Sequence, residues 1–129
     1  MSDTFQTFLL LSIGSILGAN IRMEIMDRFK NKYFIKGSDI MFINLIASFI
    51  LGFVVGLYEK NFYLINNNNF ILFFNIGFLG SFSTFSSFLF QIFMKVRARK
   101  IFDAFYIAFL TIFSGLLLAY FGYKASNAI

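Results

Sequence analysis

Residues 70–94 read FILFFNIGFLGSFSTFSSFLFQIFM, a segment that is apolar at both ends and rich in small polar residues in its middle. The part at 77–88 collects two glycines and five serine or threonine residues. A helix that crosses a bilayer needs about 20 predominantly apolar residues, so this segment is expected to span a membrane. One interpretation of the small polar residues near its centre is a helix that is broken at mid-membrane, with the freed backbone buried in protein or lining a cavity. Hydroxyls that bond back to the carbonyl four residues earlier would explain the same composition without a break.

The composition of the whole chain supports a membrane protein. Of its 129 residues, 59% are hydrophobic and 13% are charged, and the mean hydropathy is +0.78. Soluble domains carry about 25% charged residues, and a chain this small cannot bury so much apolar surface in one core. Further spans are predicted at residues 5–21, 40–58 and 102–122. We therefore predict an all-α membrane protein with a single four-span domain over residues 1–129.

The residues that are absent, and the places where acids occur, exclude several kinds of protein. The chain has neither cysteine nor histidine, which removes the usual nucleophile, general base and metal ligands. An enzyme is therefore not expected. The carboxylates lie in connectors or at span ends, at Asp3, Glu24, Asp27, Asp39, Glu59 and Asp103. A proton-coupled exporter normally needs an ionisable group inside the bilayer, so that class of four-span protein is disfavoured.

Lysine and arginine are divided unequally between the two sides of this topology. The connectors after the first and third spans lie on the same side and hold nine of the eleven, namely Arg22, Arg28, Lys30, Lys32, Lys36, Lys95, Arg97, Arg99 and Lys100. The other side has Lys60 and Lys124. Because basic loops stay in the cytoplasm, both termini are expected outside the plasma membrane. Topology explains this charge, so a nucleic-acid partner is not expected.

Neutral polar and aromatic residues inside the spans are the candidates for a binding site. Asn44 lies near the start of the second span, where an amide is costly unless it is paired. It either bonds a neighbouring helix or donates a hydrogen bond to an anion. Phe82, Phe85 and Phe88 recur at every third position, a spacing that ordinarily serves packing. The positive edges of such rings can also face an anion.

Three motifs together give the chain a resemblance to the Fluc/CrcB fluoride channel family. GANIR at 18–22 is similar to the G-A-x-x-R pattern of that family's first span. NLIASFILG at 44–52 is similar to N-x-x-G-S-F-x-x-G in the second span, and GFLGSFSTFSSF at 77–88 to G-F-x-G-x-x-T-T-F-S-T-F in the third. The positions that depart from the family include Phe42, Ala47, Ser83 and Ser87.

The resemblance implies a function and a set of site residues. It implies an antiparallel dimer with two narrow pores, through which cytoplasmic fluoride leaves passively and its toxicity is relieved. The implied fluoride pathway comprises Asn44, Phe85, Phe88, Ser86, Ser87, a span-four hydroxyl at Thr111 or Ser114, and Arg22 near the pore entrance. The resemblance also implies a structural sodium ion (Na+) at the dimer axis, held by the backbone carbonyls of Gly80 and Ser83.

The charge bias bears on which subunit completes the dimer. An antiparallel homodimer needs one sequence that inserts in both orientations, and therefore nearly balanced basic residues on the two sides. The division of nine to two favours a heterodimer with a homologous subunit of opposite orientation. Two readings stay open beside a conducting subunit: a non-conducting partner in such a heterodimer and, less favoured, a small proton-coupled exporter.

The heterodimer hypothesis makes a direct prediction about topology. Reporter proteins fused to either terminus are expected to report a single orientation, with both termini outside. The measurement is the ratio of reporter activity on the two sides of the membrane. Equal populations in the two orientations would contradict the hypothesis and favour a homodimer.

Overall fold

The computed structural model describes residues 2–30, 38–60 and 68–128, and these are almost wholly helical. Its elements are α1 (Ser2–Lys30), α2 (Ser38–Glu59), α3 (Asn68–Phe70), the π-helix η1 (Ile71–Leu79), α4 (Gly80–Phe82), α5 (Phe85–Arg97) and α6 (Ile101–Asn127). The third span is made of the four consecutive pieces from α3 to α5. Four helical stretches are long and apolar enough to cross a membrane, over residues 3–28, 40–59, 68–97 and 101–127. The prediction of an all-α chain with four such helices is confirmed.

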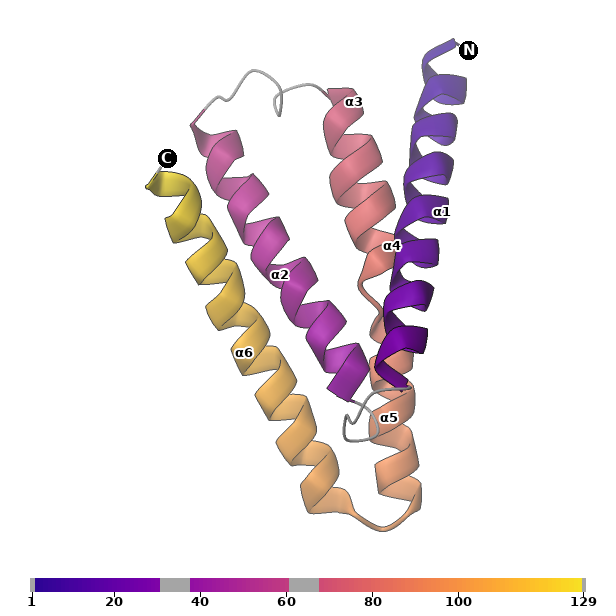
Figure 1. Cartoon of the computed structure of the whole chain (residues 1–129), viewed down its shortest axis with the longest axis vertical. Helices are drawn as coiled ribbons and strands as arrows, with labels where there is room; N and C mark the ends of the chain where they lie inside the picture. The colour runs from indigo at the N-terminus through magenta and orange to yellow at the C-terminus, as the bar shows by residue number, and fades with distance from the viewer. Residues whose placement is uncertain (1, 31–37, 61–67, 129) are drawn as a thin grey trace.

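The helices pack mainly as two pairs. α2 runs along α6, and α1 runs along η1 and α4. Both ends of the described chain lie at one end of the bundle, and the turn that joins α5 to α6 lies at the other (Figure 1). The four-span arrangement therefore places the two termini on the same side.

Glycines allow the two helices of each pair to approach closely. A Cβ atom at Gly52 of α2 would lie 2.0 Å from the carbonyl oxygen of Ala119 in α6. One at Gly18 of α1 would lie 2.3 Å from the carbonyl oxygen of Phe78 in η1. Such small-residue contacts are typical of helices that associate within membranes. The first-span glycine motif therefore has a packing role in this chain.

α1 continues well past residue 21, where the hydropathy of the sequence places the end of the first span. Ile25 and Met26 pack against a buried cluster that α2 and the third span share. The members of this cluster are Ile43, Ala47, Leu79 and Phe82. Apolar residues among the charges at 22–30 thus extend the helix to Lys30. The rest of the first connector, residues 31–37, with Lys32 and Lys36, lies outside the described residues.

Candidate functional site

The third span is interrupted at Ser83 and Thr84. Ser83 has φ −70° and ψ 151°, and Thr84 has φ −136° and ψ 110°, so both residues are extended. The first half of the span ends where the Ser83 amide and hydroxyl both donate to the carbonyl of Leu79, each at 3.0 Å. The second half begins where the Thr84 hydroxyl accepts from the amide of Ser87 at 3.2 Å. This is the side-chain cap that a helix N-terminus prefers.

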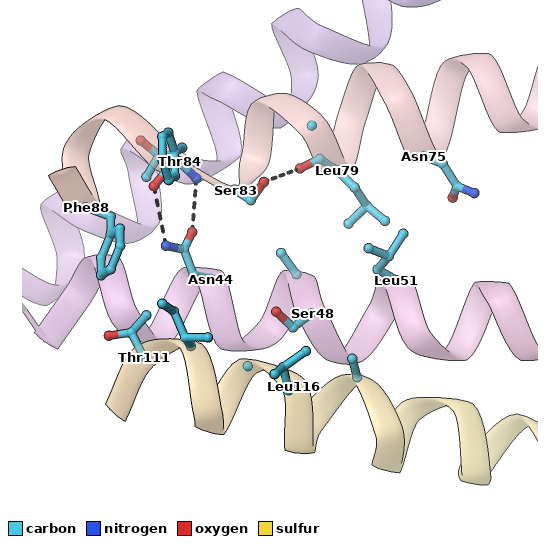
Figure 2. Close-up of a pocket in the computed structure, with 16 residues that line it drawn as sticks. Asn44, Ser48, Leu51, Asn75, Leu79, Ser83, Thr84, Phe88, Thr111 and Leu116 are labelled. Atoms are coloured by element: carbon cyan, nitrogen blue, oxygen red, sulfur yellow. Dashed lines mark hydrogen bonds between the residues drawn. The ribbon is translucent and has the colours of Figure 1, made fainter. Parts of the chain in front are cut away.

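Asn44 pairs with both backbone groups of Thr84. The Thr84 amide donates to Asn44 Oδ1 at 3.0 Å, and Asn44 Nδ2 donates to the Thr84 carbonyl at 3.4 Å (Figure 2). Thr84 is buried, and buried backbone groups of this kind need hydrogen-bond partners. Asn44 therefore satisfies the broken backbone from the neighbouring helix. Its amide carries a second N–H, so the same side chain can also donate to a ligand.

Because of these hydrogen bonds, the backbone carbonyls of Gly80 and Ser83 lose the amide donors that they would have in a continuous helix. In a continuous helix the Thr84 amide would bond to the carbonyl of Gly80, and the Ser87 amide to that of Ser83. Here those amides bond to side chains, of Asn44 and Thr84 respectively. Gly80 is exposed, and a Cβ atom built there would meet nothing within 4 Å. These carbonyl oxygens are the kind of donor that a hard cation prefers, so the residues fit the sodium ion that the resemblance implies.

A groove of about 560 Å³ lies beside the break, between α2, the third span and α6. The polar and aromatic side chains in its lining are Asn44, Ser48, Asn75, Ser83, Thr84, Phe85, Phe88 and Thr111. None of the described residues that line the groove is charged. The structure thus brings residues from three spans, far apart in the sequence, to one neutral surface (Figure 2).

The break separates the phenylalanines that recur along the third span. Phe82 lies in the buried core and stacks on Phe78, with ring centroids 5.8 Å apart. Phe85 and Phe88 line the groove, with centroids 6.4 Å apart and tilted rings. Phe88 is 8% exposed and Phe85 is 72% exposed. Packing therefore accounts for the first ring, whereas the other two face the groove.

Four of the sequence-predicted site residues lie outside the groove lining. Ser87 accepts a hydrogen bond from the Thr84 hydroxyl, and Ser114 donates to the carbonyl of Leu110. Ser86 is exposed on α5, and Arg22 lies on α1, one helical turn beyond Gly18. Of the two span-four hydroxyl residues, Thr111 is the one that lines the groove.

Three polar residues of the groove, Ser48, Asn75 and Thr84, were not singled out by the sequence analysis. Ser48 follows Ala47 in the second-span motif, and Asn75 interrupts the run FILFFNIGF of the third span. The isolated amide in an apolar run was the available signal for Asn75. A hydropathy value averaged over a whole span does not reveal a single polar residue such as Asn75.

Loss of the Asn44 side chain is expected to destabilise the protein. Asn44→Leu would leave the buried amide and carbonyl of Thr84 without partners, and each unpaired group costs about 1–3 kcal/mol. Thermal unfolding in detergent should therefore show a clearly lower midpoint for this variant. The matched control is Asn20→Leu, the same change at an exposed residue of α1. Equal midpoints for the two variants would contradict a structural role for Asn44.

The comparison with known proteins identifies the family. The model of the family described as CrcB-like protein, Camphor Resistance (CrcB), matches residues 9–123. Fluoride-specific ion channel FluC 2 of Prochlorococcus marinus (strain NATL2A) is 40% identical over 122 residues, which are 95% of each chain. FluC 1 of Parasynechococcus marenigrum (strain WH8102) is 32% identical over 95% of each chain, and FluC of Thermosipho melanesiensis is 34% identical over 89% of this chain and 91% of its own. The chain therefore belongs to the CrcB/FluC family.

Proposed function

We propose that this chain is a subunit of a fluoride-selective channel through which cytoplasmic fluoride leaves the cell passively. The observation that carries the proposal is the groove, where Asn44, Phe85 and Phe88 meet beside a broken span. Relatives that bear the name fluoride-specific ion channel match nearly the whole chain, which supports the same conclusion.

The chemistry of the groove suits a small, strongly hydrated anion. A pore for fluoride must replace the water that surrounds the ion with other hydrogen-bond donors. The second N–H of Asn44 and the hydroxyl of Thr111 can supply such donors. The edges of Phe85 and Phe88 add a weak positive potential. Because the described lining holds no fixed charge, the ion is bound weakly enough to leave again.

A structural sodium ion belongs to this proposal. The carbonyls of Gly80 and Ser83 would hold it, since their usual helical donors bond to Asn44 and Thr84 instead. When bound, the cation would offset the mutual repulsion of these carbonyl dipoles. In an antiparallel dimer it would lie on the axis between two broken spans.

The assembly proposed is an antiparallel dimer in the plasma membrane, with the termini of this chain outside. Arg97 and Arg99 lie at the α5–α6 end of the bundle, and the termini lie at the opposite end (Figure 1). With the basic residues cytoplasmic, this chain takes one orientation. Its partner is then a homologous subunit of opposite orientation, with a homodimer as the alternative.

Fluoride efflux from liposomes tests the proposed function. A fluoride electrode should record efflux through the purified channel, formed by the chain alone or with a co-expressed homologous subunit, and a chloride electrode should not. Phe85→Leu keeps an apolar side chain but removes the ring edge, so efflux should fall about tenfold, equivalent to about 1.4 kcal/mol. Phe105→Leu is the matched control, because both rings are 72% exposed and Phe105 lies outside the groove lining.

Each outcome of this assay decides between the alternatives. Absence of fluoride efflux from both preparations, or equal passage of chloride, would contradict the channel. Selective efflux from the chain alone would establish a working homodimer and count against the heterodimer. Full efflux by Phe85→Leu in a heterodimer would instead make this chain a non-conducting partner.

A further inference from the structure

Two buried side-chain oxygens in the described parts of the chain lack a hydrogen-bond partner, and both lie at the groove. They are Asn75 Oδ1 and Thr111 Oγ1. A buried polar atom that stays unpaired destabilises a protein, so native structures normally provide a partner, which can be water or a ligand. The proposed pathway already includes Thr111. No role described so far accounts for Asn75.

Asn75 lies well away from the break. It belongs to the π-helix η1, eight residues before Ser83 in the chain. π-Helical turns are rare and occur frequently at functional sites. In Figure 2, Asn75 and Thr111 lie toward opposite ends of the groove, with Asn44, Ser48 and Ser83 between them. The two unpaired oxygens therefore mark the two ends of one row of polar side chains.

We propose that Asn75 is a further polar residue of the anion pathway, which holds a hydration water of the ion at the groove end farther from Thr111. Its Oδ1 accepts a hydrogen bond from a water molecule, and the second hydrogen of that water points to the anion. Bridging waters of this kind bind nearly as well as direct contacts. The Nδ2 amino group can donate to the anion itself. This inference rests on the proposed fluoride channel.

A donor from a second subunit would also satisfy the Asn75 oxygen. Such a contact would account for Asn75 Oδ1 alone and would leave Thr111 Oγ1 without a partner. The observations favour a hydrated pathway because two unpaired oxygens lie in the same groove and polar side chains lie between them. A row of polar groups along an otherwise apolar passage is what a partly hydrated ion needs.

The test compares variants of Asn75 in the assembled channel. Asn75→Leu keeps the number and branching of the side-chain heavy atoms but has no polar atom, and fluoride efflux per dimer should fall about tenfold while dimer content, measured by cross-linking in the same membranes, is unchanged. Asn75→Gln keeps the amide and should restore most of the efflux. Asn20→Leu, an exposed change on α1, is the matched control and should conduct like the unmodified channel.

The outcomes separate this inference from the proposed function. An unmodified channel that passes no fluoride would overturn the proposed function. An unmodified channel that conducts, together with an Asn75→Leu variant that conducts equally well, would overturn the inference alone. Loss of dimer in proportion to efflux would overturn it in favour of a subunit contact. If Asn75→Leu fails to fold, Asn75→Asp is the second test. A carboxylate of nearly the same size would repel the anion and lower fluoride efflux more than tenfold if residue 75 lies on the pathway. Unchanged efflux would overturn the inference.

Discussion

Inside a bilayer a buried backbone amide or carbonyl that water does not reach needs a partner within the protein, and the rest of this structure depends on how that requirement is met at Thr84. The Asn44 amide bonds to both backbone groups of Thr84, and the Thr84 hydroxyl caps the helix that follows. These bonds satisfy the backbone at the point where the span departs from a regular helix. With them, the amides of Thr84 and Ser87 no longer donate to the carbonyls of Gly80 and Ser83, the two groups that the proposal assigns to the sodium ion. α2 is held against α6 by the close contact at Gly52, which keeps the Asn44 helix in place at the break.

The break also determines which phenylalanines of the third span pack in the core and which face the groove. Before it, Phe78 and Phe82 stack in the core; after it, Phe85 and Phe88 face the groove. The groove presents amide, hydroxyl and ring-edge groups, and its described lining holds no fixed charge. Such donors can replace part of the hydration of a small anion without binding it so strongly that it cannot leave. The same neutrality keeps the desolvation penalty of the site low, since a charge at this depth would be expensive.

Much of the fold follows from the sequence, whereas the site does so only in part. Hydropathy predicts four helical spans, since each requires only a long apolar run. It does not predict how far the first helix continues beyond residue 21, because Ile25 and Met26 among charged residues reveal their packing only in three dimensions. The three-residue spacing gives no reason to distinguish Phe82 from Phe85 and Phe88. The extended backbone at Ser83 and Thr84 places the first ring in the core and the other two at the groove. Asn75 reaches the groove through the folding of the third span against α2 and α6, and no local motif encodes that contact.

The conformation of Ser83 and Thr84 in a bilayer is the most direct test of this account. Carbon chemical shifts of these two residues, measured by solid-state nuclear magnetic resonance on the assembled channel in lipid, report their backbone geometry without reference to transport. The account predicts extended values at both positions and helical values at Phe82 and Ser87 on either side. Helical values through Ser83 and Thr84 would contradict it. In an unbroken span the carbonyls of Gly80 and Ser83 would accept their regular helical hydrogen bonds, and Asn44 would lose its partner at Thr84.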